Sequence, residues 1–168
     1  MDIEICEEEL LSLMKKINIH LEMQLEHCLR EENVSGVQVY LMVYILRHHP
    51  TGTYITELCH EVGVSKTTMS LLVKKLREKG YLIFQENISD DRKKRILPTT
   101  KMQKSASTFL KRANEMEQEI CKALNAEERH QLQQIEKKIL YQCEQMEIQR
   151  KRQEVIDYEN RFGTIKTV

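Results

Sequence analysis

The chain has 168 residues, enough for one substantial hydrophobic core, with 31% charged residues, 5% aromatic residues and no tryptophan. This composition is typical of a helix-rich protein and argues against a sheet-rich one. The formal net charge is zero, so the charge of the whole chain does not point to a nucleic-acid partner, and only a local concentration of cations could indicate one.

Several functional classes are disfavoured by the sequence. No apolar segment approaches the roughly 20 residues of a membrane span, and the first residues, MDIEICEEEL, are acidic where a secretory signal is basic. We therefore expect a cytoplasmic protein without a membrane partner. The five cysteines are widely spaced and contain no C-x-x-C pair, which argues against a disulfide framework or a zinc ribbon. Because nucleophile elbows, phosphate-binding glycine loops and paired carboxylates are missing, we expect no enzymatic activity. We also expect no cofactor and no resident metal.

Residues 5–30 are predicted to form a long amphipathic helix, because apolar residues recur along them at three- and four-residue spacing. These residues are Leu10, Leu13, Met14, Ile17, Leu21, Leu25 and Cys28. After a loop at residues 33–36, Ser35 can cap a second helix, VQVYLMVYILRHH, which is apolar nearly all round and is therefore expected to be buried. The segment Pro50-Thr51-Gly52 ends this helix.

Two short helices that meet at Gly63 are predicted within residues 53–80. Their core-facing residues recur at helical spacing. In the first helix these are Ile55, Leu58, Cys59 and Val62, and in the second they are Met69, Leu72, Val73 and Leu76. Ser65 is a natural N-cap for the second helix, and Gly80 suits the left-handed position after its end. This arrangement is typical of a DNA-binding helix-turn-helix.

The outward face of the second short helix is rich in hydroxyl and ammonium groups, which can reach base edges and phosphates in a major groove. The candidate DNA contacts on this helix are Ser65, Lys66, Thr67, Thr68, Ser70 and Lys74. Any soluble helical hairpin also shows an apolar stripe, a glycine and a polar face, so a purely structural role stays open at this point.

A change of period after Gly80 predicts a two-stranded hairpin, in which YLIFQ is followed by the polar turn ENISDD and RKKRIL returns before Pro98. Its cations can enter a narrow minor groove or contact phosphates. They are Arg92, Lys93, Lys94 and Arg95. Such a run can also merely keep an edge strand soluble.

The distribution of charge favours the DNA-binding interpretation. Residues 63–101 contain ten Lys or Arg against four Asp or Glu, a net charge of +6. Residues 1–33 contain three against nine, a net charge of −6. The positive charge is therefore concentrated on the segment that would contact a polyanion.

Two long helices are predicted after residue 99. Thr100 with Gln103 resembles a capping box for the first helix, and Asn125 with Glu128 resembles one for the second. Each cap is followed by a stripe of apolar residues. In the first helix the stripe is Ala106, Phe109, Leu110, Ala113, Met116, Ile120 and Cys121, and in the second it is Leu132, Ile135, Ile139 and Met146. Together with the stripe of residues 5–30 they need a partner, most simply the same helices of a second copy. Residues 151–168 are predicted to be a tail that begins as a helix end and finishes polar and frayed.

This order of parts resembles the MarR family of winged-helix transcription regulators over about residues 10–148. The resemblance is most specific in ELCHEVGVSKTTMSLLVKKLREKGYL, NISDDRKKRILPTT and LNAEERHQL. It implies a mainly α winged helix-turn-helix fold (α+β) with a two-stranded wing, assembled as a homodimer. The expected parts are an N-terminal dimerisation helix (1–33), the DNA-binding domain (34–99), C-terminal dimerisation helices (100–150) and the polar tail (151–168).

The family resemblance also implies a function. It implies a transcription regulator, expected to be a ligand-responsive repressor, that binds a pseudo-palindromic operator in double-stranded DNA. Asp90 and Arg92 match the family's Asp-x-Arg, in which the carboxylate positions an arginine at the minor groove. Two positions depart from the family pattern. Leu71 stands where a cation is common, and it can contact a thymine methyl but cannot bind guanine bidentately. Pro98-Thr99 replaces the usual Leu-Thr after the wing.

An effector that prefers one separation of the two recognition helices would shift the dimer between binding and non-binding states. Candidate ligand-binding residues, in a cleft beneath the dimer seam, are Met14, Tyr40, Tyr44 and His48. Residues of these types at helical spacing are more often plain core, so the effector and its site stay open.

Three alternative functions are also open. A metal-responsive regulator could take its ligands from the pairs His20/His27, His48/His49 or Cys59/His60, but none of these pairs has a further soft ligand at i, i+4 spacing. A thiol-responsive regulator could use Cys6 or Cys28, but both lie in an acidic helix, which disfavours a thiolate. A winged helix that binds a protein instead of DNA is the third alternative, and the cationic segment argues against it.

Overall fold

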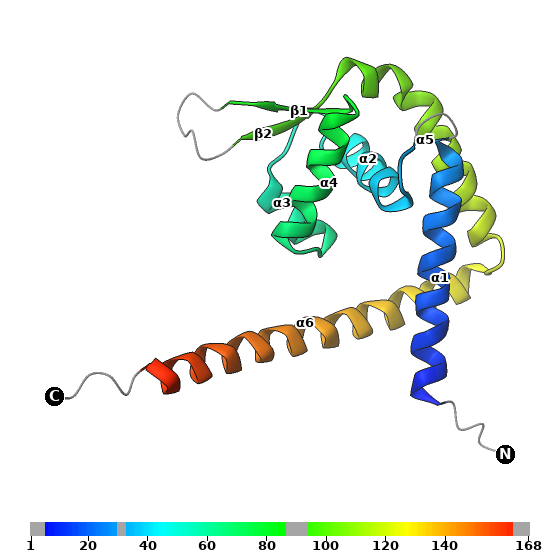
Figure 1. Cartoon of the computed structure of the whole chain (residues 1–168). Coiled ribbons are helices and arrows are strands. Elements are labelled where there is room, and N and C mark those ends of the chain that lie inside the picture. Colours follow the sequence, from blue (N-terminus) through cyan, green and yellow to red (C-terminus); the bar gives the residue numbers. More distant parts are fainter. Residues whose placement is uncertain (1–5, 30–32, 87–93, 163–168) are drawn as a thin grey trace. The chain divides into compact units, whose positions relative to one another are not determined.

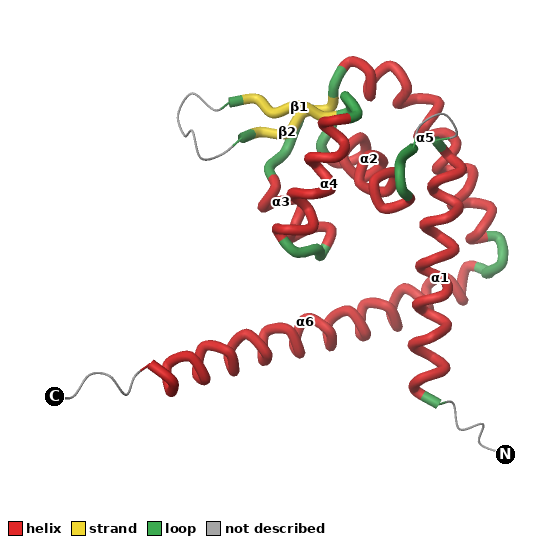
Figure 2. The backbone as a smooth tube through the Cα atoms, viewed as in Figure 1, coloured by secondary structure: helices red, strands yellow, loops and turns green. Residues whose placement is uncertain are grey.

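The computed structural model describes residues 6–29, 33–86 and 94–162 (Figures 1 and 2). The chain divides into two compact units, Met1–Gln118 and Glu119–Val168. Counting only described residues, the first unit contains four helices, a two-stranded sheet and nearly all of a fifth helix, and the second is dominated by one long helix. Among the described residues, no helix combines the length and the apolar character that crossing a bilayer requires.

α1 (Glu7–Cys28) and α2 (Gly36–His48) confirm the first two predicted helices. α2 begins where the backbone N–H of Ser35 donates to Gln38 Oε1 over 3.1 Å, which is one half of a capping box. Most of α2 is buried, as its apolar sequence predicts. In α1, by contrast, only the last turns are buried, at Leu25 and Cys28.

Gly36 brings α2 into direct contact with the backbone of α1. A Cβ atom on Gly36 would lie 2.6 Å from the carbonyl carbon and 2.8 Å from the Cα of Glu22. No side chain therefore fits at this crossing. The backbone N–H of Gly36 also donates to Glu26 Oε1 over 2.9 Å, so a carboxylate of α1 lies at the positive end of α2.

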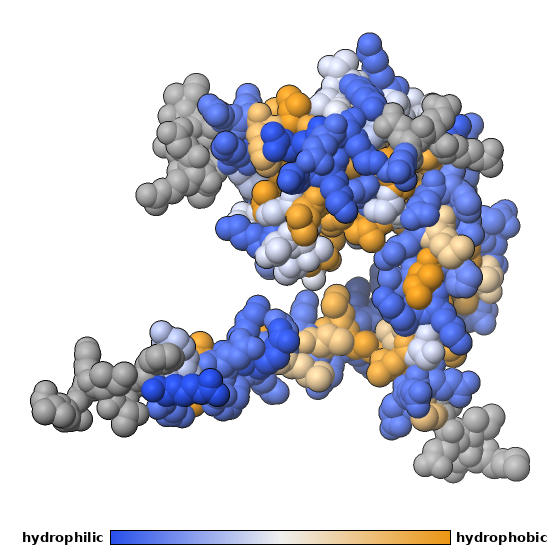
Figure 3. Space-filling view, viewed as in Figure 1, coloured by the Kyte–Doolittle hydropathy of each residue, from blue (hydrophilic) through white to orange (hydrophobic). Residues whose placement is uncertain are grey.

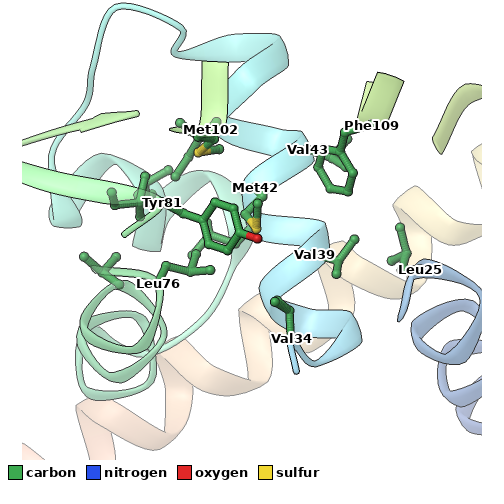
Figure 4. Packing of buried hydrophobic residues seen from close by; sticks show 14 of the residues in the cluster. Leu25, Val34, Val39, Met42, Val43, Leu76, Tyr81, Met102 and Phe109 are labelled. Atoms are coloured by element: carbon green, nitrogen blue, oxygen red, sulfur yellow. The ribbon is translucent and has the colours of Figure 1, made fainter. Parts of the chain in front are cut away.

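α3 (Ile55–Val62) and α4 (Lys66–Glu78) form the predicted helix-turn-helix. Gly63 and Gly80 both adopt left-handed backbone, with φ of 77° and 78°, and Ser65 Oγ accepts the Thr68 backbone N–H over 3.1 Å as the predicted N-cap. The core-facing stripe of α4 is confirmed, because Met69 and its stripe neighbours are buried or packed against the core. Figure 4 shows buried side chains from α1, α2, α4 and α5 meeting in this single core.

The hairpin consists of β1 (Leu82–Gln85) and β2 (Arg95–Pro98), which pair antiparallel with Leu82 opposite Pro98. Pro98, which the sequence placed after the strand, is its last residue. Thr53, predicted to open the helical stretch, instead pairs with β2. Its backbone N–H donates to Ile96 O over 2.9 Å and its carbonyl accepts from Ile96 N–H over 2.7 Å. This bridge connects the segment before α3 to the wing.

α5 (Thr100–Cys121) begins one residue earlier than a cap at Thr100 would place it. The prediction that Thr100 caps this helix is wrong, because Thr100 is already helical and a cap precedes the first helical residue. Thr99 caps the helix instead. Its Oγ1 accepts the Met102 N–H over 3.3 Å and donates to Gly80 O over 2.6 Å. The start of α5 is thereby tied to the end of α4.

α6 (Ala126–Phe162) begins with the predicted capping box, in which Asn125 N–H donates to Glu128 Oε2 over 2.8 Å and Glu128 N–H donates to Asn125 Oδ1 over 2.9 Å. The helix continues past residue 150 to Phe162, so the helical beginning predicted for the tail extends over residues 151–162. This segment contains no glycine or proline, and ion pairs such as Arg150 with Glu147 support the helix.

Large apolar side chains remain exposed on α1 and on α6 (Figure 3). On α1 they include Leu10, Leu13 and Ile17 of the predicted stripe. On α6 they include Leu132, Ile135 and Met146. Within each helix these residues recur at helical spacing, so each helix carries an apolar face that its own unit leaves uncovered.

Candidate nucleic-acid interface

The outward face of α4 displays the residues that the sequence singled out. Lys66 and Thr67 are exposed in its first turn, Ser70 is half-buried, and Lys74 is exposed one turn further on. The hydroxyl groups of Ser65 and Thr68 lie 2.9 Å apart, and Ser65 also caps the helix. The cations and hydroxyls of this face lie outside the hydrophobic core, so a polyanion can contact them without disturbing the core.

Among the described residues, Lys74 has one loose partner. Its Nζ lies 3.9 Å from Glu78 Oε1, and both side chains are more than 60% exposed. An exposed pair of this kind contributes at most about 1 kcal/mol. Lys74 can therefore leave Glu78 for a phosphate at little cost.

The wing contributes cations close to its open end. Lys94 is exposed, and Arg95 is half-buried opposite Gln85. The predicted contacts Arg92 and Lys93 and the positioning residue Asp90 lie outside the described residues. The described part of the hairpin therefore brings Lys94 and Arg95 to the end of β2 that leads into the predicted turn.

Arg77 is a further cation beside the outward face of α4 that is not among the predicted contacts. Its guanidinium carbon lies 3.9 Å above the ring centroid of Phe84, so the last turn of α4 and strand β1 are joined by a cation–π contact. A groove of about 420 Å³ lies beside them, lined by Lys74, Arg77, Glu78, Leu82, Ile83 and Phe84. In the sequence, only the net positive charge of residues 63–101 pointed to Arg77. Its contact could not be predicted, because the ring of Phe84 belongs to another element.

The predicted ligand-binding residues on α2 form a ring cluster. The ring centroids of Tyr40 and Tyr44 are 6.2 Å apart, and those of Tyr44 and His48 are 4.5 Å apart. Tyr44 OH donates to Glu61 Oε2 over 3.2 Å, and His49 Nε2 lies 2.6 Å from the same oxygen. The cluster therefore connects the end of α2 to α3. Met14, the fourth candidate, lies half-buried on α1.

Glu61 gives this connection a pH dependence. The hydrogen bond from His49 is the main cause that lowers the pKa of Glu61 below its ordinary value of 4.5. Because the pKa of Glu61 is lower in the folded chain than in the unfolded chain, its carboxylate stabilises the fold at pH values above 4.5. This stabilisation is lost as the pH falls through the lowered pKa. We expect Glu61→Gln to reduce the free energy of unfolding at neutral pH by no more than about 1 kcal/mol, since the carboxylate is partly exposed.

Urea unfolding of both proteins at a series of pH values would measure this difference. The gap between the two curves should narrow as the medium becomes acidic. Glu78→Gln is a suitable control, because Glu78 is exposed and, among the described residues, pairs only loosely with Lys74. A gap that widens in acid would contradict the assigned role of Glu61.

A cavity of about 320 Å³ lies between the end of α1, α2 and α5. It is lined by Cys28, Leu29, Met42, Tyr81, Lys101, Met102, Lys104, Ser105, Thr108, Phe109 and Arg112. None of the four predicted ligand-binding residues lines it. Burial raises the pKa of the Cys28 thiol, with the charge of Arg112 opposing the effect. Within the described residues, no group of three or more His, Cys, Asp or Glu could hold a metal ion.

Comparisons with known proteins agree with this geometry. Residues 32–93 match the model of the MarR family. The structure is similar to that of MepR from S. aureus in a DNA complex, with 22% identity, a TM-score of 0.72, and coverage of 83% of this chain and 99% of that chain. It is also similar to the transcription regulator MarR from Oenococcus oeni PSU-1, with 20% identity, a TM-score of 0.68, and coverage of 79% of this chain and 98% of that chain.

A third similar structure is that of Bordetella bronchiseptica BpsR, whose DNA binding is regulated by 6-hydroxynicotinic acid. It has 14% identity, a TM-score of 0.65, and coverage of 83% of this chain and 96% of that chain. At these identities the likeness establishes the winged-helix fold. No curated protein matches the sequence.

Proposed function

We propose that the protein is a cytoplasmic, sequence-specific DNA-binding transcription regulator of the MarR family that represses its target as a homodimer, because residues 32–93 match the model of that family. In this proposal α4 is the recognition helix and the β1–β2 hairpin is the wing. The observation that carries the proposal is the outward face of α4, which presents hydroxyls and cations such as Thr67 and Lys74 beside a cation-bearing hairpin.

The proposed dimer follows from the apolar faces of α1 and α6. If both faces are covered by a second copy, two α4 helices can enter successive major grooves about 34 Å apart on a pseudo-palindromic operator. The wings would then reach the flanking minor grooves with Arg92 to Arg95, and Asp90 would position Arg92 there. Phosphate contacts from these cations would supply most of the affinity.

We also propose that a small molecule regulates this binding, as 6-hydroxynicotinic acid does for BpsR. The cavity between α1, α2 and α5 supports regulation by a small molecule. It adjoins both α1, a proposed dimerisation helix, and the hydrophobic core on which α4 packs. Its cations, Lys101, Lys104 and Arg112, favour an anionic effector. The ring cluster of Tyr40, Tyr44 and His48, with Met14, is the second candidate site.

Selection of bound duplexes from a random pool tests the proposed DNA binding. The selected sequences should contain two inverted half-sites whose centres are about one helical turn apart. A winged helix that binds only a protein partner would enrich no sequence and would show no salt-sensitive binding to duplex DNA. Either result would contradict the proposed function.

Lys74→Ala should lower the slope of log K against log salt by about one unit, because the variant loses one phosphate contact. Fluorescence anisotropy of a labelled operator between low and moderate salt would measure the slope. Lys111→Ala is a matched control: Lys111 on α5 makes the same 3.9 Å contact to a glutamate one turn away, but lies off α4. An unchanged slope in Lys74→Ala would exclude Lys74 from the interface.

A further inference from the structure

Leu71 is an exposed apolar residue at the centre of the outward face of α4. Its side chain is 54% exposed, whereas Met69, Val73 and Leu76 of the same helix are fully buried. The residues one turn away on either side are Thr67, Thr68, Lys74 and Lys75, all polar and exposed. Leu71 is thus an isolated branched hydrocarbon within a hydroxyl- and ammonium-bearing surface.

The neighbouring side chains restrict what Leu71 can contact. The cation of Arg77 is held over the ring of Phe84, on the side of α4 that faces β1, and Leu71 does not line the groove between these elements. Leu71 is neither part of the hydrophobic core cluster nor one of the partly buried residues that pack against it. In a complex, the partner that α4 contacts would therefore be the surface that covers the Leu71 side chain.

Base edges in the major groove differ in what they offer to a leucine. Guanine, cytosine and adenine present hydrogen-bond donors and acceptors, which leucine cannot satisfy, whereas thymine also presents a C5-methyl group. A leucine placed over guanine would remove water from polar atoms without replacing their hydrogen bonds. Placed over thymine, it would bury apolar surface on both sides.

We propose that Leu71 reads the C5-methyl group of a thymine at one position in each half-site of the operator. This inference rests on the proposed function, because it requires α4 to lie in the major groove. The flanking Thr67, Thr68 and Lys74 would contact neighbouring polar atoms, so the apolar contact selects one base pair within an otherwise polar interface. Burial of one methyl group corresponds to about a four-fold difference in affinity.

The test uses an operator selected from the random pool, in which each thymine of a half-site is replaced in turn by deoxyuridine. Deoxyuridine lacks only the C5-methyl group, so base pairing is kept. Wild-type protein should lose about four-fold affinity at one such position. Leu71→Ala should bind the thymine and deoxyuridine operators equally at that position, while its circular dichroism matches the wild type because the residue is exposed.

Ile83→Ala is the matched control, since Ile83 is an exposed apolar residue of β1 that lies outside α4, with 49% exposure. It should keep the wild-type sensitivity to deoxyuridine. Wild-type protein that binds every deoxyuridine operator as tightly as the thymine operator would overturn the inference and leave the proposed function standing. An equal deoxyuridine effect in Leu71→Ala would also overturn it. Failure of the pool to yield any operator would instead count against the proposed function.

Discussion

Replacement of Ile17 by aspartate is expected to convert the proposed homodimer into monomers and to weaken binding to the proposed operator by about 100-fold or more. The reason is that a monomer contacts one half-site, and the gain from linking two binding events is of the order of 10² to 10⁴. Ile17 belongs to the apolar stripe of α1 and is 58% exposed within its own chain. In the proposed dimer the new carboxylate would be buried in an apolar seam without a cation.

The substitution should leave the single chain folded, because Ile17 contributes little to its core. Sedimentation velocity would give the oligomeric state, circular dichroism the helix content, and anisotropy the operator affinity. Ile19→Asp serves as the control. Ile19 is two residues along the same helix, on its opposite face, with 45% exposure. A dimeric Ile17→Asp variant, or a monomeric Ile19→Asp variant, would show that α1 does not form the seam in the way proposed.

Local patterns in the sequence were sufficient to predict the helix-turn-helix. The burial of Met69 and its stripe, the left-handed turn at Gly63 and the cap at Ser65 all depend on residues within one or two turns of each other. Helical periodicity and capping chemistry are local properties, so a single sequence contains them. The box of Asn125 with Glu128 could be predicted for the same reason.

Features that depend on distant partners could not be predicted in this way. Thr53 pairs with Ile96, and Arg77 stacks on Phe84, because the fold brings separate elements together. The cap of α5 was displaced by one residue because the Thr99 hydroxyl also bonds to Gly80 O. The cations of the candidate site were visible in the sequence, whereas the contacts that orient them were not.

Gly36→Ala gives the sharpest contrast between local propensity and packing. Alanine is the better helix former by roughly 0.5–1 kcal/mol in a helix interior, and the backbone of Gly36 has no positive φ that would exclude it. On local grounds the substitution should therefore be neutral or stabilising. The structure predicts the opposite, because the new methyl group would overlap the Glu22 peptide unit of α1, whose backbone cannot move aside by a change of rotamer.

We expect Gly36→Ala to lower the free energy of unfolding by about 3 kcal/mol, the upper part of the range for overpacked sites. Separation of α1 from α2 would also weaken the 2.9 Å hydrogen bond from Gly36 N–H to Glu26 Oε1. Urea unfolding followed by circular dichroism would measure the loss. Gly63→Ala is the comparison: its Cβ would meet no atom within 4 Å, and only the strain of positive φ applies, about 1–2 kcal/mol. If Gly36→Ala were as stable as the wild type, α1 and α2 could not cross as closely as the structure shows, because a methyl group at Gly36 has no other space to occupy.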